Sequence, residues 1–579
     1  MLSENVCRVL QARYLRRGAR GEVIETHDEL FERVARAVSE AELLYGTAAD
    51  ARYWEERFHE MLASLDFLPN SPTLMNAGTS LGQLSACFVL PIEDSVESIF
   101  GTLRDAAMIQ RTGGGTGFAF SRLRPAHDLV ASTGGSSSGP VSFMRIYDSA
   151  TENIKQGGRR RGANMGVLRV DHPDIEEFIQ AKRDGVSLRN FNLSVGATDE
   201  FMNAVETGSD LDLRHPGTQR VVRTVAARGL FDQICESAWA TGDPGLIFLD
   251  TIKRTNPVPD CAIESTNPCG EVPLCAYESC NLGSINLVRL VDNGAIDWNR
   301  LRTQVHDGVR FLDDVISVNR FPLEAIERMT LANRKIGVGV MGFAEWCILL
   351  GISYSSDQAI SLADELMAFI AREARLASAR LANERGVFPN WSLSTFAIHG
   401  IRLRNATQTS IAPTGTISII AGTSPSIEPL FALAYRRHGV LGDQSLAEFN
   451  PLAIRHLRRL GLESELDSVA ATGRLSPACG ETGKLFVTAL EISPEQQVRV
   501  QAAFQKHVDN AVSKTVNLAE DASPSDVAAT YRLAYELGCK GVTVYRYGSK
   551  VEGVLQLGLG ESPVDRENFA KCDPGACRL

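Results

Sequence analysis

The chain has 579 residues, of which 44% are hydrophobic and 22% are charged, and its formal net charge is −11. This length exceeds the roughly 250–300 residues at which single hydrophobic cores usually stop growing, so we expect a large body with smaller appendages. The acidic balance excludes a protein that binds duplex nucleic acid through a basic face.

The N-terminal segment and the cysteines bear on location. The first 22 residues contain neither the apolar core nor the small-residue cleavage site of a signal peptide, and no run of eighteen apolar residues occurs. The twelve cysteines are irregularly spaced in a large chain, unlike the dense framework of a small secreted protein. We therefore expect a cytoplasmic protein that does not cross a membrane.

The first clear structural signal is a helix that begins near Thr26. Thr26 and Glu29 have the spacing of a capping box. The apolar residues that follow share one helical face: Leu30, Phe31, Val34, Val38, Ala41 and Leu44. Residues 1–65 are therefore predicted to form a small N-terminal helical region.

From residue 66 to residue 547, short apolar runs alternate with amphipathic helical patterns. The β-like runs include Lys335–Phe343, Thr409–Ala412 and Gly541–Tyr545, and a long helical pattern covers Ser493–Leu518. This alternation predicts an α/β body with a largely parallel sheet. Periodicity fades after Tyr547, so residues 548–579 are predicted to be a flexible tail.

Glycine-rich stretches interrupt this body at Thr112–Gly117, Ser132–Pro140 and Gln156–Gly166. The first stretch does not have the complete G-x-G-x-x-G pattern with a later acidic residue, so a dinucleotide-binding loop is not indicated. Pro413–Ile417 (PTGTI) is a further loop motif, whose free N–H groups and threonine hydroxyls suit a phosphate. An ordinary strand-to-helix turn has the same pattern, so the motif alone leaves both interpretations open.

The segment with the most potential chemistry is Cys261–Asn286, which carries four cysteines. Seven, five and four residues separate them, so the paired knuckles of a structural zinc site are absent and no metal site is indicated. Packing as small apolar side chains is the plain alternative for each cysteine. Cys269 differs because Asn267 and Glu271 flank it at two residues on either side. Alternate side chains of an extended segment share a face, so an amide, a thiol and a carboxylate are presented together.

Asn267–Glu271 (NPCGE) resembles the finger-loop motif of ribonucleotide reductase large subunits, and five further blocks agree with that family in order. These blocks are Phe67–Gly78, Ser85–Asp94, Ser279–Asn286, Ala412–Ser418 and Gly538–Ser549. The resemblance runs from Leu2 to the tail. It implies a ten-stranded α/β barrel made of two parallel five-stranded halves that run in opposite directions, with a finger loop at its centre.

The resemblance implies roles for the central motif. Cys269 would carry a transient thiyl radical that abstracts the ribose 3′-hydrogen of a ribonucleotide. Glu271 would take the 3′-hydroxyl proton as a general base, and Asn267 would orient the sugar.

The resemblance also implies a dithiol, Cys87 and Cys280, that supplies two electrons and becomes a disulfide. Cys275 is a rival for Cys280, which we prefer because it directly precedes Asn-Leu-Gly and lies eleven residues after the radical cysteine. In the tail, Cys572 and Cys577 would carry electrons from thioredoxin or a similar dithiol reductant to the active-site disulfide.

Nucleotide-binding residues follow from the same resemblance. The implied substrate pocket consists of Ser71, Ala86, Gly115, Pro413, Thr414, Gly415, Thr416 and Ile417. Asp94 and Ser95 lie where the family binds a (d)NTP effector at the interface of a homodimer. Gln156–Gly166 resembles the loop that relays effector identity to the substrate base, although its arginines also suit a solvated loop.

The family divides by radical source, and this sequence most resembles the adenosylcobalamin-dependent class II branch. Tyr545 and Tyr547 are not adjacent, unlike the tyrosine pair of the oxygen-dependent branch, and no glycyl-radical segment is recognisable. The implied activity is reduction of ribonucleoside diphosphates to 2′-deoxyribonucleotides. Three alternatives stay open: an oxygen-dependent large subunit with a separate radical-generating subunit, a catalytically inactive nucleotide-binding regulator, and a metal-binding structural protein.

Overall fold

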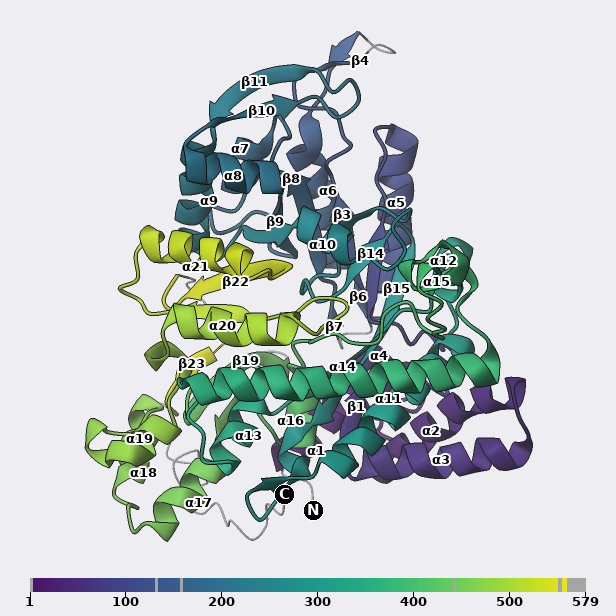
Figure 1. Ribbon diagram of the computed structural model, residues 1–579, viewed down its shortest axis with the longest axis vertical. Helices are drawn as coiled ribbons and strands as arrows, with labels where there is room; N and C mark the ends of the chain where they lie inside the picture. Colours follow the sequence, from purple (N-terminus) through teal and green to yellow (C-terminus); the bar gives the residue numbers. More distant parts are fainter. Residues whose placement is uncertain (1–3, 131–133, 157–159, 442–443, 550–554, 560–579) are drawn as a thin grey trace.

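The structure is a computed structural model, which describes residues 4–130, 134–156, 160–441, 444–549 and 555–559. An α/β barrel forms the centre, and helices cover its outside (Figure 1). The long helix α14 (Asp357–Arg385) runs across most of the molecule in Figure 1, beside α11 (Trp298–Val318) and α20 (Pro494–Gln505).

The N-terminal region is helical, as expected. It contains α1 (Glu4–Arg13), α2 (His27–Ser39), η1 (Glu40–Leu44) and α3 (Ala48–Ala63). The predicted capping box is present, because the Thr26 side chain accepts from the Glu29 N–H and the Glu29 side chain accepts from the Thr26 N–H. The predicted apolar face was too long: α2 ends at Ser39, and the tighter turn of η1 leaves Leu44 65% exposed.

The first half of the barrel is a set of five parallel strands. They are β2 (Cys87–Leu90), β3 (Gly115–Ala119), β8 (Asn164–Arg169), β9 (Phe191–Ala197) and β12 (Gly245–Phe248). Long helices in the connections cover the outer face of this half: α5 (Val96–Gln110), α6 (Gly139–Asn153) and α9 (Ala227–Thr241).

The second half runs in the opposite direction. Its parallel ladders pair β15 (Glu278–Asn286) with β18 (Ile336–Met341), and β21 (Thr515–Leu518) with β22 (Gly541–Arg546). Single parallel bridges, from Val338 to Thr409 and from Ile411 to Val512, connect these two ladders. β15 is antiparallel to β2 and β22 is antiparallel to β12, so the two halves close into a barrel. The predicted barrel of two opposed parallel halves is confirmed.

Two predicted elements differ from the structure. Thr409–Ala412 was expected to be a regular strand, but it is joined to its neighbours only by isolated bridges. The helix predicted over Ser493–Leu518 ends at Gln505, and the chain then enters β21. The β-branched residues Val512, Thr515 and Val516 favour extended backbone, which explains why the helical pattern does not continue.

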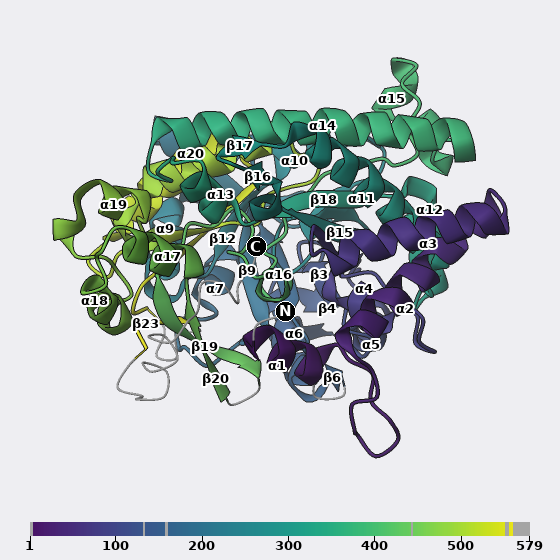
Figure 2. The same ribbon diagram turned by 90° about the horizontal axis from the view of Figure 1, so that it is seen from below.

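Smaller elements surround the barrel. The three-stranded sheet of β19 (Ala434–Leu441), β20 (Gln444–Phe449) and β23 (Leu555–Leu557) lies to one side, next to α17 and α18 (Figure 2). The remaining helices are α4 (Ser71–Asn76), α7 (Ile175–Gln180), α8 (Asp199–Thr207), α10 (Leu249–Thr255), η2 (Leu287–Leu290), α12 (Glu324–Asn333), α13 (Phe343–Leu349), η3 (Pro389–Leu393), α15 (Thr395–Ile398), α16 (Ile417–Ala421), α17 (Pro451–Arg459), α18 (Glu465–Thr472), η4 (Pro477–Cys479), α19 (Gly480–Leu485), η5 (Ala489–Glu491) and α21 (Pro524–Glu536). Apart from one further hairpin inside the barrel, the other strands are β1 (Phe67–Pro69), which pairs with β15, and the hairpins β4 (Leu129–Val130) with β5 (Gly135–Ser136), β6 (Lys155–Gln156) with β7 (Arg160–Arg161), β10 (Asp210–Arg214) with β11 (Val221–Ala226) and β16 (Val291–Asp292) with β17 (Ala295–Ile296).

A buried ion-pair network joins the N-terminal helices to the barrel. The Arg385 guanidinium, which is fully buried, pairs with Asp313 (2.9 Å), Asp314 (2.6 Å) and Glu42 of η1 (2.6 Å). Arg334 pairs with Asp313 from the other side at 2.8 Å. The N-terminal helices are therefore fixed to α11 and α14 by charge as well as by apolar packing. Among the described residues, no helix is long and apolar enough to cross a membrane.

Candidate active site

A hairpin inside the barrel carries the central motif. Strands β13 (Ile263–Thr266) and β14 (Pro273–Cys275) are antiparallel, and the turn between them contains Asn267–Glu271. The Asn267 side-chain oxygen accepts a hydrogen bond from the Val272 N–H (3.0 Å), and the Gly270 N–H donates to the Asn267 carbonyl (3.1 Å). Gly270 has a φ of +83°, which favours glycine, so the motif itself shapes the tip of this finger hairpin.

Glycines of β3 let the finger hairpin approach the barrel wall. A Cβ atom on Gly117 would lie 1.7 Å from the Thr266 carbonyl oxygen, and one on Gly115 would lie 2.8 Å from the Pro268 ring. The glycine-rich stretch Thr112–Gly117 therefore ends inside β3, where its glycines let the finger hairpin pack closely against the strand. The Asn192 amide donates to the Pro268 carbonyl at 2.7 Å and fixes the tip from β9.

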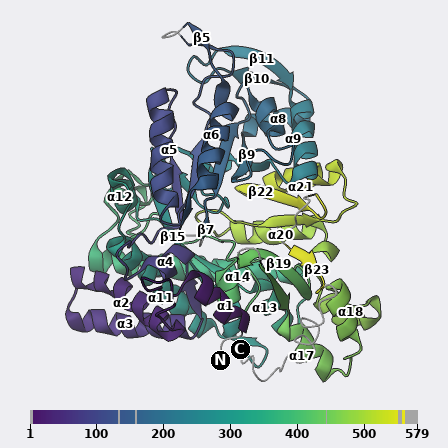
Figure 3. The same cartoon turned by 180° about the vertical axis from the view of Figure 1, so that it is seen from behind.

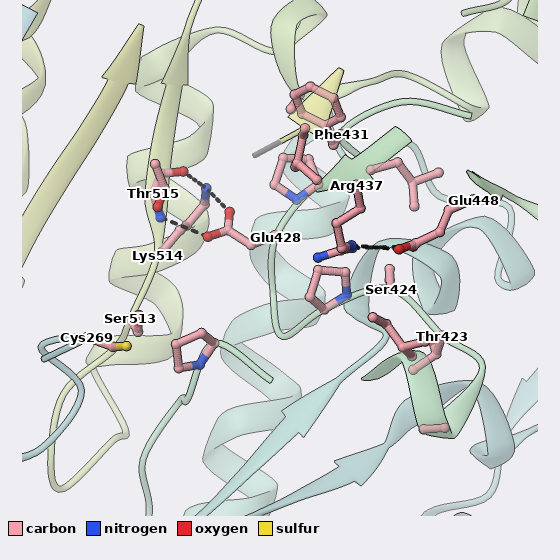
Figure 4. Close-up of a pocket in the computed structure, with 18 of the residues that line it drawn as sticks. Cys269, Thr423, Ser424, Glu428, Phe431, Arg437, Glu448, Ser513, Lys514 and Thr515 are labelled. Carbon is pink, nitrogen blue, oxygen red and sulfur yellow. Dashed lines mark hydrogen bonds and ion pairs between the residues drawn. The ribbon is translucent and has the colours of Figure 1, made fainter. Parts of the chain in front are cut away.

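Cys269 lies at the tip of the finger hairpin and lines a cavity of about 1490 Å³. It is an exposed residue, and Figure 4 shows its sulfur at the cavity wall. Asn267 and Glu271 on either side are 2% and 3% exposed. The Glu271 carbonyl accepts hydrogen bonds from the Ser410 hydroxyl and the Ala511 N–H, both at 2.9 Å. The thiol is thus presented to the cavity while both flanking residues are held in the barrel.

Cys87 and Cys280 are direct neighbours across β2 and β15. Residues opposed in this way have Cα atoms about 4.5–5.5 Å apart, within the range that permits a disulfide. Both cysteines are buried in one apolar cluster with Val272 and Leu274 of the finger hairpin. Burial raises the pKa of the Cys280 thiol, and the positive charge of Lys335 opposes that rise.

Cys275, the rival of Cys280, is instead bonded to Cys261 in a disulfide with Cα atoms 5.9 Å apart. This bond closes the open end of the finger hairpin, where Cys275 is opposite Ile263. No local pattern in the sequence indicates this partner, although the two cysteines bracket the motif on both sides. In the described part of the chain, no cluster of three or more His, Cys, Asp or Glu side chains could hold a metal ion.

The predicted phosphate motif is a turn that leads into the short helix α16. Thr414 has a φ of +53°, its hydroxyl oxygen accepts from the Ser426 N–H (2.7 Å), and its carbonyl accepts from the Ser418 N–H (2.9 Å). Of the predicted substrate residues, Pro413 lines the cavity together with Cys269. Ser71 begins α4, where its hydroxyl is 2.8 Å from the Tyr14 hydroxyl, and Ala86 is buried beside Cys87.

Charged residues that the sequence analysis did not single out also line the cavity. Arg437 pairs with Glu448 at 2.6 Å, and Lys514 pairs with Glu428 at 3.0 Å (Figure 4). Glu345 of α13 accepts from the Thr423 hydroxyl (2.6 Å), the Ser424 N–H (2.8 Å) and the Asn450 amide (2.7 Å), and burial raises its pKa. These residues come from distant parts of the chain, so no local motif marks them.

The predicted effector residues lie away from the cavity wall. Asp94 pairs with Arg124 at 2.7 Å, and the Ser95 side chain caps the N-terminus of α5. Residues 157–159 of the predicted relay loop lie outside the described residues, as do Cys572 and Cys577 of the tail.

Lys540 supports the segment that holds the finger hairpin. It is 5% exposed, and its ammonium group donates to the carbonyls of Asp509 (2.6 Å) and Asn510 (2.5 Å). The next residue, Ala511, donates to Glu271. Burial lowers the pKa of Lys540 to about 8, against an ordinary value of 10.5.

We expect the stability of the wild type to rise with pH relative to Lys540→Met. Between about pH 8 and pH 10.5 the unfolded chain binds more protons at this lysine than the folded chain, so a higher pH favours folding. The gain from about pH 7.5 to about pH 9.5 should be about 2 kcal/mol. Urea denaturation gives the free energy of unfolding of both proteins at both pH values. If the difference in this free energy between the two proteins does not change with pH, the lowered pKa of Lys540 is contradicted.

Comparisons with known proteins agree with this architecture. Residues 85–400 and 393–545 match the ribonucleotide reductase barrel domain, and residues 1–82 match the ribonucleotide reductase all-alpha domain. A class Id ribonucleotide reductase alpha subunit of Actinobacillus ureae has a similar fold, with a TM-score of 0.76 at 24% identity, over 94% of this chain and 97% of that chain. Fold and domain matches together define a radical reductase barrel with its N-terminal helical domain.

The chain belongs to the ribonucleotide reductase family, which confirms the resemblance seen in the sequence. It is 49% identical to a vitamin B12-dependent ribonucleoside-diphosphate reductase of Thermoplasma acidophilum, over 98% of this chain and 82% of that protein. It is 53% identical to a protein of the same description from Mycobacterium tuberculosis (strain CDC 1551 / Oshkosh), over 99% of this chain and 83% of that protein.

Proposed function

We propose that the chain reduces ribonucleoside diphosphates to 2′-deoxyribonucleoside diphosphates, with adenosylcobalamin as its radical source. One observation carries the proposal: Cys269 is presented to a large cavity at the tip of the finger hairpin, while Cys87 and Cys280 are paired behind the same hairpin. Relatives at 49–53% identity that are described as vitamin B12-dependent ribonucleoside-diphosphate reductases support the substrate class and the cofactor.

The side chains divide the reaction between them. Cys269, as a thiyl radical, removes the ribose 3′-hydrogen, Glu271 accepts the 3′-hydroxyl proton, and Asn267 orients the sugar. The 2′-hydroxyl leaves as water and C2′ gains a hydrogen. Cys87 and Cys280 lose two electrons and two protons as their S–S bond forms, so the sum is ribonucleotide plus dithiol to deoxyribonucleotide, disulfide and water. The turn at Pro413–Ile417 binds the diphosphate with its N–H groups.

The cavity suits a second large molecule beside the nucleotide. Its volume of about 1490 Å³ exceeds the roughly 300–1,000 Å³ of ordinary small-molecule pockets. The wall with Phe431, Arg437 and Glu448, which Figure 4 shows across the cavity from Cys269, would hold adenosylcobalamin. When bound, the cofactor supplies a carbon-centred radical by cobalt–carbon homolysis. Cys269 is exposed at the cavity wall, so the bound nucleotide and cofactor would cover it and keep water and oxygen away from its thiyl radical.

The test is an assay of ribonucleoside diphosphate reduction with adenosylcobalamin and dithiothreitol, with no second subunit. Formation of the deoxyribonucleotide supports the proposal. Activity only after a separate metal-containing subunit is added would favour the oxygen-dependent alternative. Nucleotide binding without turnover under both conditions would favour an inactive regulator.

A homodimer with an effector site is the second part of the proposal. Helix α5 lies at the edge of the upper part of the molecule with α6 beside it (Figure 3), and their exposed apolar side chains form a surface suited to a two-fold interface. These side chains are Val96, Phe100, Met108 and Ile146, which are 63%, 46%, 37% and 40% exposed. Asp94 and Ser95, at the start of α5, would bind the (d)NTP effector beside this interface.

Phe100→Glu is expected to convert the dimer into a monomer, because a carboxylate would be buried without a partner in an apolar interface. Sedimentation velocity measures the change, and effector control of base preference should be lost with it. An exposed glutamate elsewhere, in Leu460→Glu, serves as the matched control. A Phe100→Glu protein that remains as dimeric as this control would place the interface on another surface.

Electron delivery through the tail is the third part of the proposal. A double Cys572→Ser, Cys577→Ser variant should lose thioredoxin-driven turnover but keep turnover with dithiothreitol, which diffuses in directly. Steady-state assays with each reductant measure this. Equal loss with both reductants would show that the tail cysteines do not shuttle electrons.

A thioredoxin-type reductant and the irregular cysteine pattern both favour a cytoplasmic location.

A further inference from the structure

A fully buried ion pair joins the start of the strand that carries Cys280 to the residue just before β18. Glu278 begins β15, and its carboxylate is 2.8 Å from the Lys335 ammonium, with side chains 0% and 1% exposed. The same carboxylate accepts from the Cys275 N–H of β14 (2.8 Å) and from the Asn333 amide (2.7 Å). One side chain therefore ties the base of the finger hairpin to β15, two residues before Cys280.

Stability alone does not explain such a pair. The cost of removing two charges from water often equals or exceeds their attraction, so a buried ion pair is weak evidence for a stabilising role. The adjacent Arg334 pairs with Asp313, but that pair belongs to the network that fixes the N-terminal helices and faces α11 and α14. The neighbours Arg334 and Lys335 thus form buried ion pairs with different parts of the protein. Arg334 pairs with α11, whereas Lys335 pairs with the strand that carries Cys280.

The charge of Lys335 is also placed for the chemistry of Cys280. To reopen a Cys87–Cys280 disulfide, a thiolate of an incoming dithiol attacks one sulfur, a mixed disulfide forms, and the other sulfur leaves with the electron pair. The second thiol of the dithiol then releases the remaining cysteine and becomes a disulfide itself. Ile336 of β18 is opposite Asn281 of β15, so Lys335 lies next to Cys280 along the paired strands. Burial and the carboxylates of Glu278 and Glu271 oppose a thiolate at Cys280, and the positive charge of Lys335 favours it.

We propose that Glu278 and Lys335 are positioning residues for the reductive half of the reaction. Glu278 holds the finger hairpin against the strand of Cys280, and Lys335 provides the positive charge that favours a thiolate at that cysteine. The inference rests on the proposed function, because it takes Cys87 and Cys280 as the reducing pair.

The test compares Lys335→Met, Glu278→Gln and the double variant with the wild type. The rate at which dithiothreitol reduces the Cys87–Cys280 disulfide is measured by alkylation and mass spectrometry, without nucleotide or cofactor. This readout stands apart from turnover, so failure of the reductase activity and failure of the inference are distinguishable. Thermal unfolding and the KM for the nucleotide are measured on the same proteins.

We expect Lys335→Met to slow disulfide reduction by about tenfold, the effect of about two pKa units at the leaving sulfur when about half of each unit appears in the rate, with KM unchanged. The double variant should recover stability, because no buried charge is left unpaired. It should recover only part of the exchange rate, because it lacks the opposing carboxylate of Glu278 but also the larger favourable effect of Lys335. Asp313→Asn, which breaks the neighbouring buried pair, should lower stability without slowing the exchange. Full recovery of both stability and exchange rate in the double variant, or an equally slow exchange in Asp313→Asn, would overturn the inference in favour of a merely structural role.

Discussion

Replacing Cys269 with serine is expected to lower ribonucleotide reduction by at least about 1,000-fold, which corresponds to about 4 kcal/mol of transition-state stabilisation. Serine has nearly the same shape, but its O–H bond is much stronger than the S–H bond of cysteine, so the radical that attacks the ribose does not form. The side chain lines the open cavity and is not part of the core, so folding should be unaffected. Initial rates of deoxyribonucleotide formation measure the loss.

The control for this variant is Cys479→Ser. Cys479 is half-buried in η4 and does not line the cavity, so its replacement should leave the rate unchanged. Nucleotide and adenosylcobalamin should bind to Cys269→Ser as they do to the wild type, because the cavity wall is kept. A Cys269→Ser rate equal to that of Cys479→Ser would show that another residue carries the radical.

Cys280→Ser is expected to stop turnover after at most about one product per enzyme, because one half of the disulfide-forming pair is missing. The strand register that places Cys280 opposite Cys87 is the basis of this expectation. Quantified product per enzyme, with dithiothreitol in excess, measures it. Radical formation should persist in the variant, since Cys269 is intact.

Cys275→Ser is the matched variant for this second prediction. Cys275 lies five residues before Cys280 in the sequence, but it is bonded to Cys261 at the base of the finger hairpin. Multiple turnover should therefore continue in Cys275→Ser. Sustained turnover in Cys280→Ser together with its loss in Cys275→Ser would reverse the assignment of the two cysteines.

Much of the fold could be predicted from the sequence. The capping box at Thr26, the buried run that became β18 and the ordered family blocks led to the correct architecture. The helix predicted through residue 518 failed because apolar spacing does not distinguish a helix from buried extended chain when both sides are covered. That Thr409–Ala412 forms only isolated bridges could not be predicted, because such bridges depend on the neighbouring strands and not on the segment itself.

The site was predictable where its chemistry is local in the sequence. Asn267, Cys269 and Glu271 form one motif, and the finger loop that carries them was implied by the family resemblance. The disulfide of Cys275 with Cys261 could not be predicted, because it depends on how the two hairpin strands pair. Glu278 and the cavity residue Glu345 were missed for a similar reason: their partners Lys335 and Thr423 come from segments far away in the chain.

The central claim is that Cys269, as a radical, removes the hydrogen at the ribose 3′ position. A substrate with deuterium at that position tests it most directly, by rapid-quench measurement of a single turnover in the presence of adenosylcobalamin. The account predicts that deuteration slows the wild type, because the C–D bond breaks more slowly than the C–H bond, and that Cys269→Ser forms no product from either substrate. Equal rates with both substrates, or product formation by Cys269→Ser, would contradict it.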